Sequence, residues 1–518
     1  MAAPMKAMLP CLVLVCLFVS GAAAQTSLQL SQLQLRYRVL SRSASLNNEQ
    51  KAELKKIEDA AAAARAKGNT ALISRELHRG IALMEGRAWT AHSDFTNSLV
   101  LAPEAVVCDP ANRLFICLRQ QYPAPRDGGG KLTAHVSLSR AGLAAAGKGK
   151  AKGGGDARPL GQFPVDETAM AKAFFRFAVE AATDAEAGHQ LNIELRDGEK
   201  LVHRQSSPVY FIRDFDSKRG NIEGRLALIR GFDQAKASIR YPFDFAQVLN
   251  SGRIEPAQYD FLAGIARSEE LLKSIEAGKD PLPTERGVLS RHYKFEEAGE
   301  VMPYRLVVPK SYDGSKAVPL IIVLHGLGGT ENTFIQQGNG ALPRLAEERG
   351  FIVATPLGYR RNGGYGRPGA LDKETARMTQ LSEQDVLNVL RLVRENYKVD
   401  PARIYLMGHS MGGGGTWTLG SKHATIWAGL APIASGGAGA NALPLANLKQ
   451  QNIPVYCVHG DADRTAPVEG SRSMVAELKK LGVEHEYHEI PGGTHGDVVG
   501  PAIPKIVEFF LSKRRATK

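Results

Sequence analysis

Residues from about 289 onward alternate between short apolar segments and longer amphipathic ones, and this alternation constrains the fold more than any other feature. The apolar segments are rich in Val, Ile and Leu, as is typical of buried strands, and they occupy residues 304–309, 319–326, 351–356, 403–408, 429–435 and 453–460. The amphipathic segments have helical periodicity and occupy residues 382–397, 471–482 and 503–513. Apolar strands that alternate with helices predict a mainly parallel sheet covered on both faces. The fold class predicted for residues 289–518 is therefore α/β.

Residues 25–288 lack that alternation and are expected to form an N-terminal accessory region, partly helical and partly β-rich. A helix is predicted between residues 46 and 68, where good helix formers follow Asn47 and Asn48. Either asparagine can cap this helix, and Gly68 is expected to end it.

The rest of this region shows weaker patterns. Alternating apolar residues at 132–139 predict a half-buried strand, and residues 189–205 predict two strands joined by an Asp-Gly turn. Residues 222–277 are predicted to be helical, with breaks near Pro242 and Gly252. Because no motif here carries chemistry, we expect the region to affect substrate access or docking.

The first 24 residues are typical of a secretory signal peptide. Lys6 precedes an apolar run, and the small residues Ala22 and Ala24 mark a cleavage site. The run is shorter than the roughly 20 residues that a membrane span needs. We expect cleavage after Ala24 and export to the periplasm or the extracellular space, with an uncleaved anchor as the alternative.

The expected export determines the bonding state predicted for each cysteine. Cys11 and Cys16 leave with the signal peptide. Cys108 and Cys117 are close in sequence in an exported chain, so a disulfide is expected, with two separate buried thiols as the alternative. Cys457 lies in an apolar strand segment and is predicted to be a buried free thiol. The chain has no Cys-x-x-Cys pair or other metal-ligand spacing, so no metal site is predicted.

The net charge of +12 and the pI of about 9.3 do not predict a nucleic-acid partner, because the positive residues are spread along the chain. The densest cluster, Lys513, Arg514 and Arg515, lies in the last residues and is expected to be a solvated tail.

The segment Gly408-His409-Ser410-Met411-Gly412 is a G-x-S-x-G motif between a predicted strand and a following helix. On such a turn the serine has a strained backbone, the glycines leave room for neighbouring chain, and the hydroxyl projects above the sheet edge. Ser410 is therefore the candidate nucleophile, and a merely structural glycine-rich turn is the alternative.

A serine hydroxyl needs a base, and the base needs an orienting acid. In this architecture the chain order is serine, acid, histidine. His495 follows a last strand, predicted at residues 486–490, on a glycine-rich loop and is the candidate base. The weaker candidates are His423, His459, His485 and His488. Asp461 and Asp463 both follow a strand at its carboxyl end, and either can supply the acid.

An acyl-transfer site also needs donors for the oxyanion. The segment "LHGLGGT", residues 324–330, follows a predicted strand, and its glycines allow the backbone to approach a substrate closely. One donor is expected to be the Met411 backbone N–H, and the other the backbone N–H of Leu327 or Gly328.

These motifs together give residues 290–518 a resemblance to the α/β-hydrolase superfamily. The chain most resembles the secreted esterase branch that contains poly(3-hydroxybutyrate) depolymerases, feruloyl esterases and dienelactone-hydrolase-like proteins, a branch related to prolyl-oligopeptidase-type peptidases. The resemblance rests on the segments "VLHGLGGT", "DPARIYLMGHSMGGGGTW", "VHGDADRTAP" and "PGGTHGD". In that family the acid lies three residues after the glycine of an HGxxDxxVP-like loop, which implies Asp463 here. Ala466 stands where the family often has valine. The first half resembles no family that we can name.

The resemblance implies a serine hydrolase that cleaves carboxylic esters through Ser410, Asp463 and His495, without a metal or organic cofactor. Its substrate is expected to be a carbohydrate-linked or polymeric ester. A prolyl-oligopeptidase-type peptidase and a non-catalytic binding protein on the same scaffold are the alternatives. The segment at residues 360–380, together with Tyr359, is expected to shape the substrate pocket.

Overall fold

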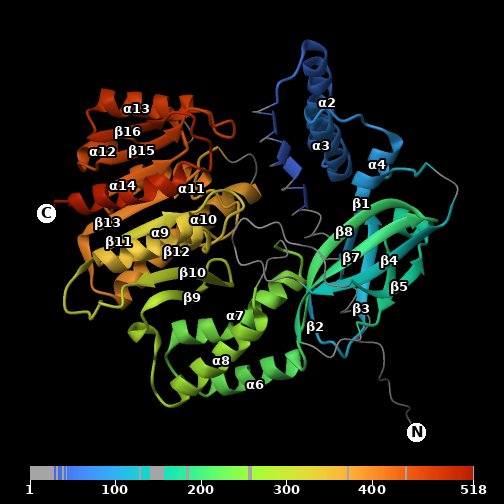
Figure 1. Ribbon diagram of the computed structural model, residues 1–518, viewed down its shortest axis with the longest axis horizontal. Coiled ribbons are helices and arrows are strands. Elements are labelled where there is room, and N and C mark those ends of the chain that lie inside the picture. Colours follow the sequence, from blue (N-terminus) through green and yellow to red (C-terminus); the bar gives the residue numbers. More distant parts are fainter. Residues whose placement is uncertain are drawn as a thin grey trace, which may run out of the picture. The chain divides into compact units, whose positions relative to one another are not determined.

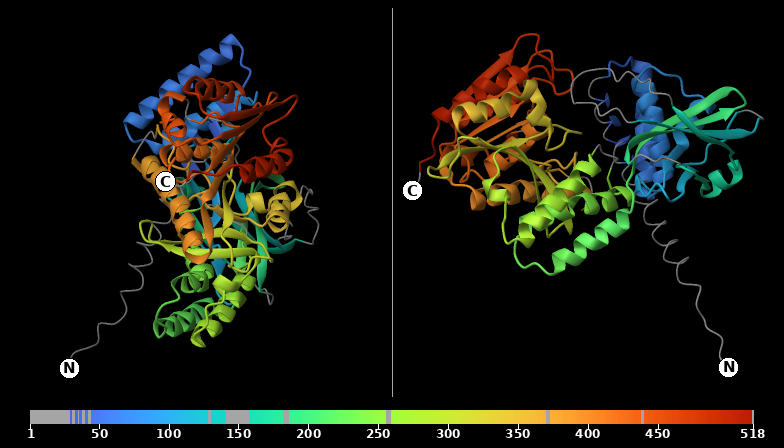
Figure 2. Two further views of the ribbon diagram at one scale, coloured as in Figure 1. Left: turned by 90° about the vertical axis from the view of Figure 1, so that its left-hand side faces the viewer. Right: turned by 60° about the horizontal axis from the view of Figure 1, so that its bottom comes forward.

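The computed structural model describes residues 29–30, 33–34, 36–37, 40–41, 44–127, 130–140, 157–181, 186–254, 259–369, 373–437 and 440–516. The predicted signal peptide, residues 1–24, lies outside these ranges. The chain divides into two compact units, Met1–Arg225 with Pro242–Arg267 and Leu226–Tyr241 with Ser268–Lys518 (Figures 1 and 2). The second unit thus contains residues 226–241 and 268–288, which precede the predicted boundary at residue 289.

Two consecutive helices, α2 (Asn48–Ala66) and α3 (Thr70–Met84), belong to the first unit. The Asn47 side chain accepts the Gln50 N–H at 2.8 Å, and the Gln50 side chain accepts the Asn47 N–H at 3.0 Å. This capping box satisfies two backbone donors at the start of the helix. Gly68, with φ of 64°, lies in the turn that follows α2. The predicted helix is confirmed, with Asn47 as its cap.

Two sheets share one apolar core in the first unit. A three-stranded sheet has the order β1 (Leu99–Pro103), β3 (Leu114–Gln120), β6 (Phe175–Val179). A five-stranded sheet has the order β2 (Val107–Cys108), β8 (Lys200–Phe211), β7 (Ala187–Asp197), β4 (Leu132–Arg140), β5 (Arg158–Pro164). Two short helices accompany the sheets, α4 (Ala91–Ser98) and α5 (Glu167–Lys172).

The three strands predicted in this region are confirmed as β4, β7 and β8. The apolar residues of β4 alternate into the core, as the sequence indicated. Strand β3 was not predicted. Phe115 and Cys117 lie on its second face, so its apolar residues show no alternation in the sequence.

The expected disulfide between Cys108 and Cys117 is wrong, because both thiols are free. The two residues lie in strands of different sheets, β2 and β3. The Cys117 thiol donates to Glu104 Oε1 at 3.3 Å. Burial raises the pKa of each of the two thiols to about 12, which keeps them protonated. The prediction of a buried free thiol at Cys457 is confirmed.

Helices α6 (Phe215–Ala227), α7 (Asp233–Asn250) and α8 (Phe261–Glu276) follow the sheets along the chain. The break predicted near Pro242 is wrong, because α7 continues through it. Ile239 and Phe243, on either side of the proline, are both buried, and such packing outweighs the loss of one helical hydrogen bond. The break near Gly252 is confirmed, since α7 ends at Asn250 and Gly252 has φ of 68°.

The second unit is built on an eight-stranded sheet (Figure 1). Its strand order is β16 (His485–Ile490), β15 (Val455–Gly460), β14 (Gly429–Ile433), β13 (Val399–His409), β11 (Val318–Leu324), β12 (Ile352–Pro356), β10 (Glu300–Val308), β9 (Gly287–Phe295). Strands β9 and β10 are antiparallel to their neighbours, and the other six are parallel. The predicted, mainly parallel sheet is confirmed.

Helices cover both faces of this sheet. One core contains residues of α9 (Thr333–Arg349) and α14 (Val499–Ser512), and the other contains residues of α10 (Lys373–Asn396), α11 (Met411–Lys422), α12 (Ala446–Gln450) and α13 (Glu469–Leu481). Alternate residues of β11 enter the two cores, which explains its continuous apolar sequence. Within the described residues, no helix is long and apolar enough to cross a bilayer.

Candidate active site

Ser410 lies between the end of β13 and the start of α11, in the middle of the sheet. Its backbone has φ of 56° and ψ of −114°, a conformation that residues with a Cβ rarely adopt. The Ser410 N–H donates to Ile433 O at 2.9 Å, and Ser410 O accepts the Gly414 N–H at 2.9 Å. Hydrogen bonds on both sides therefore hold the strained turn in place.

The two glycines of the motif are required by close approach of the backbone. A Cβ on Gly408 would lie 2.4 Å from Gly412 O, and a Cβ on Gly412 would lie 2.1 Å from Leu324 O. Both distances are well below van der Waals contact. A side chain at either position would therefore push the turn away from β11.

The structure brings the three predicted triad side chains together. His495 Nε2 lies 2.8 Å from Ser410 Oγ, and His495 Nδ1 lies 2.7 Å from Asp463 Oδ2. Because the carboxylate can only accept, the partners assign the proton to Nδ1, which leaves Nε2 to accept the serine hydroxyl. Asp463 follows β15 and His495 follows β16, so both reach Ser410 from the carboxyl edge of the sheet.

Backbone donors hold the Asp463 carboxylate in its ionised form. Oδ1 accepts the N–H groups of Thr465 at 2.8 Å and Ala466 at 2.9 Å. Burial by itself raises the pKa of Asp463, but the hydrogen bonds from Ala466 and His495 outweigh it and hold this pKa below its usual range. The carboxylate is thus charged and fixed in direction, as an orienting acid must be.

Asp461, the other candidate acid, has a different environment. Its Oδ1 accepts the Gly492 N–H at 2.7 Å, so it braces the turn after β16. Three of the four weaker candidate histidines bond elsewhere: His423 with Glu383, His485 with Val483 O, and His488 with Glu486. The structure therefore separates Asp463 and His495 from the other candidates.

The loop after β11 passes beside the serine, since a Cβ on Gly326 would lie 3.4 Å from Ser410 Cβ. The Gly328 N–H, one of two candidate oxyanion donors there, donates to Arg361 O at 2.9 Å and is occupied. Gly326 O accepts the Gly329 N–H at 2.9 Å. The Gly326 C=O and the Leu327 N–H belong to the same trans peptide and point in opposite directions. The Leu327 N–H therefore points away from the hydrogen bond between Gly326 O and Gly329.

Two N–H groups therefore remain as candidate oxyanion donors. Among the described residues, the Leu327 N–H has no acceptor. The Met411 N–H is the first of α11 and has no partner within the helix. The positive end of the α11 dipole adds to the preference for negative charge at this point.

Two histidines contact the triad in ways that the motifs alone did not reveal. His409 Nε2–H donates to His495 O at 2.7 Å, and the two rings lie 4.7 Å apart. Burial lowers the pKa of His409 to about 4, so its ring is neutral. His459 Nε2 lies 3.1 Å from Asp463 Oδ2. The available signals were the position of His409 inside the serine motif and that of His459 near the end of a strand.

Some residues of the 360–380 segment, which was expected to shape the substrate pocket, have other roles. Tyr365 is fully buried in the core and cannot contact a substrate, so that expectation is wrong for this residue. Arg361 instead holds the loop after β11, because its guanidinium donates to Gly328 O and its own carbonyl accepts the Gly328 N–H. Residues 373–380 belong to α10.

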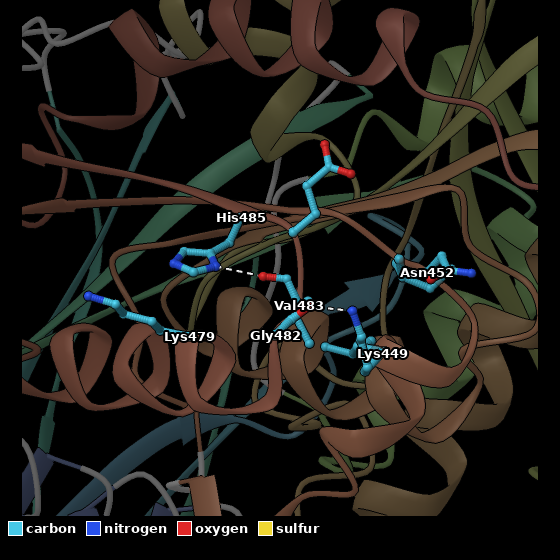
Figure 3. A pocket seen from close by; sticks show the side chains of 9 residues that line it. Lys449, Asn452, Lys479, Gly482, Val483 and His485 are labelled. Carbon is cyan, nitrogen blue, oxygen red and sulfur yellow. Dashed lines mark hydrogen bonds between the residues drawn. The ribbon is translucent and has the colours of Figure 1, made fainter.

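A pocket of about 380 Å³ lies at the opposite edge of the sheet, at the amino ends of β15 and β16 (Figure 3). Lys449 and Lys479 line it, and Lys449 Nζ donates to Gly482 O at 2.8 Å. The triad follows the carboxyl ends of these strands, so this pocket is separate from it. No group of three or more potential metal ligands occurs among the described residues.

The order of the eight strands, with a serine turn after β13 and the acid and histidine after β15 and β16, defines an α/β-hydrolase fold. Residues 305–499 match the dienelactone hydrolase family and form a domain of that family. The resemblance inferred from the four motifs is confirmed for this domain.

Two curated relatives are similar over part of the same region. A bifunctional acetylxylan esterase/xylanase of Neocallimastix patriciarum is 32% identical over 145 residues, which are 28% of this chain and 19% of the relative. Feruloyl esterase B of Piromyces equi is 27% identical over 187 residues, which are 33% of this chain and 31% of the relative. The chain thus spans less than a third of the length of either.

Two solved structures are also similar to part of this chain. A thermostable esterase is 28% identical with a TM-score of 0.38 and covers 44% of this chain and 63% of its own. A ferulic acid esterase of Anaeromyces mucronatus is 18% identical with a TM-score of 0.35 and covers 44% of this chain and 90% of its own.

Proposed function

We propose that the second unit is a serine hydrolase that cleaves carboxylic esters, with Ser410 as nucleophile, His495 as general base and Asp463 as orienting acid. The observation that carries the proposal is the chain of hydrogen bonds from Ser410 Oγ through His495 to Asp463, at 2.8 and 2.7 Å. The dienelactone hydrolase family domain and the esterase names of the relatives support an ester as substrate.

In this mechanism the nucleophile, the base, the acid and the oxyanion donors all come from this chain, and water is the second substrate. Ser410 Oγ attacks the acyl carbon while its proton passes to His495 Nε2, and the oxyanion lies between the N–H groups of Met411 and Leu327. His495 then gives the proton to the leaving alcohol, and the acyl group remains on the serine. A water molecule, deprotonated by the same nitrogen, releases the acid and restores the serine. Throughout, the Asp463 carboxylate stabilises the imidazolium.

The substrate class is proposed from the relatives. One is named as an acetylxylan esterase and the other as a feruloyl esterase. We therefore propose an ester of a small or aromatic acid on a carbohydrate, in which the sugar hydroxyl is the leaving alcohol. Leu327, an exposed apolar residue of the loop after β11, is proposed to supply an apolar contact for the acyl group.

Export and the accessory role of the first half complete the proposal. Cleavage after Ala24 would leave Gln25 as the first residue of the secreted protein, which N-terminal sequencing of secreted material tests. A first residue of Met1 would contradict it. The first unit is proposed to govern docking on a large substrate, since the predicted nucleophile, base and acid all belong to the second unit.

The decisive experiment combines labelling with a substrate panel. The full chain should hydrolyse p-nitrophenyl acetate, methyl ferulate or acetylated xylan and leave peptide p-nitroanilides intact. A fluorophosphonate should label Ser410, as located by peptide mass spectrometry, and Ser410→Ala should lose both labelling and turnover, by on the order of a thousandfold or more. Turnover retained in Ser410→Ala excludes the mechanism, and preferential anilide cleavage favours a peptidase.

A further inference from the structure

We propose that His459 is a positioning residue for the catalytic acid, with its imidazole donating a hydrogen bond to Asp463 Oδ2 from the interior of the domain. The inference rests on the proposed function, because it assigns a role in the same triad. His459 is the penultimate residue of β15, and Asp463 follows four residues later in the loop at the end of that strand.

The environment of His459 determines which ring nitrogen carries the proton. The side chain is fully buried. Nε2 faces two groups that can only accept, Asp463 Oδ2 at 3.1 Å and Ala466 O at 2.9 Å. Nδ1 faces the Ser471 hydroxyl at 2.7 Å, and a hydroxyl can donate as well as accept. The partners therefore assign the ring proton to Nε2, where Ala466 O at 2.9 Å and Asp463 Oδ2 at 3.1 Å share it, and assign a hydrogen bond from Ser471 to Nδ1.

Besides His459 Nδ1, the Ser471 hydroxyl has two other acceptors within reach, Ser435 O and the sulfur of Cys457. Ser435 O lies 3.2 Å from Ser471 Oγ, which is longer than the 2.7 Å to His459 Nδ1. A hydroxyl proton directed to Nδ1 leaves every polar atom of the imidazole satisfied without a second ring proton. A buried imidazole that met only apolar groups would leave its two nitrogens without hydrogen bonds, which costs free energy. The hydrogen bonds around His459 therefore explain why a histidine is tolerated at this buried position.

Through this contact Asp463 receives four donors. Thr465 and Ala466 donate to Oδ1, whereas His495 and His459 donate to Oδ2. The donors surround the carboxylate and prevent its rotation, so that Oδ2 stays directed at His495. The bond from His459 also draws electron density from Oδ2 and weakens the pull of the carboxylate on the His495 proton.

This second effect predicts a shift in pH dependence that a packing role would not cause. A nearby carboxylate raises the pKa of an imidazole, and it does so more strongly when fewer other donors share its charge. Removal of the His459 donor should therefore move the acid limb of the kcat/KM profile, which reports protonation of the catalytic imidazole in the free enzyme, to higher pH.

The other titratable groups around the ring leave that limb undisturbed. His409, on β13, is neutral because burial lowers its pKa to about 4. Glu489, on β16, is ionised because the hydrogen bond from Arg472 lowers its pKa to about 2. Cys457, on the same strand as the ring, is protonated because burial raises its pKa to about 12. None of the three changes charge between about pH 5 and about pH 9.

The test compares His459→Met with His459→Gln in the full chain. Met fills the space without a donor, whereas the Gln side-chain amide keeps an N–H to offer to Oδ2. In His459→Met we expect kcat on p-nitrophenyl acetate to fall about tenfold with little change in KM, the equivalent of one positioning hydrogen bond. Its acid limb should move to higher pH. Both effects should be largely reversed in His459→Gln.

The outcomes separate this inference from the proposed function. If the wild-type chain hydrolyses no ester, the proposed function fails. If the wild-type chain is active and both variants share its acid limb, or lose rate equally, His459 only packs and the inference is overturned. If His459→Met does not fold, the nitrogen NMR signals of ¹⁵N-histidine in the wild-type chain decide, with His459→Gln for assignment. A proton on Nδ1 with a bare Nε2 would contradict the inference.

Discussion

Ser410 is the proposed nucleophile and also has the most strained backbone of the proposed site, so its replacement is informative about stability as well as activity. At φ of 56° and ψ of −114°, a residue with a Cβ is strained by about 1–3 kcal/mol. Ser410→Ala keeps the Cβ and the strain. Ser410→Gly removes both, because glycine adopts positive φ readily.

The expected difference in folding stability between the two variants follows from two opposing free-energy contributions. Relief of strain stabilises the glycine variant by about 1–3 kcal/mol, and the extra backbone entropy of glycine in the unfolded chain destabilises it by roughly 0.5–1 kcal/mol. Both variants lose the hydrogen bond to His495, so that term cancels. Ser410→Gly should therefore be more stable than Ser410→Ala by about 1 kcal/mol, while both lack activity.

Guanidinium unfolding followed by tryptophan fluorescence measures this difference. Trp417 and Trp427 are fully buried in the second unit, so two of the three tryptophans report on it. The control is Ala476→Gly at an exposed position of α13, which should be destabilised by about 0.5–1 kcal/mol. If Ser410→Gly is less stable than Ser410→Ala by a similar amount, the backbone at Ser410 stores no strain and the reasoning is refuted.

Three further predictions concern the acid, a buried carboxyl and the thiols. Asp463→Asn should lower kcat/KM on p-nitrophenyl acetate by on the order of a thousandfold or more, and Asp461→Asn far less; equal losses would reverse the assignment. Burial raises the pKa of Asp385 from 3.8 to about 6, so the folded state binds this proton more tightly than the unfolded state. Stability against denaturant should then fall as the pH rises from about 4 to about 6, and Asp385→Asn should remove that part of the decline; an unchanged slope would contradict it. Finally, alkylation in denaturant without reductant should label both Cys108 and Cys117, whereas a disulfide-linked peptide in the mass spectrum would show the opposite.

Part of the first unit was beyond prediction from the sequence for identifiable reasons. A strand with one polar face, such as β4, has a visible alternation, whereas β3 has Phe115 and Cys117 on its second face and shows none. The disulfide between Cys108 and Cys117 was expected from proximity in the sequence, but the two strands that carry them belong to different sheets. Pro242 was expected to break a helix, yet buried neighbours on both sides keep α7 continuous.

The sequence by itself determined the α/β class of the second half and the positions of Ser410, Asp463 and His495 after strands, because periodicity and turn glycines depend on neighbours a few residues away. Whether those side chains meet was decided only by the tertiary structure, since the sheet order brings β13, β15 and β16 together. Tertiary structure also decided which loop N–H groups are free. The Gly328 N–H is occupied by Arg361 O, and a sequence pattern cannot show a hydrogen bond to a residue 33 positions away. Contacts between distant segments depend on the packing of the whole domain, which is why they appear only in the folded chain.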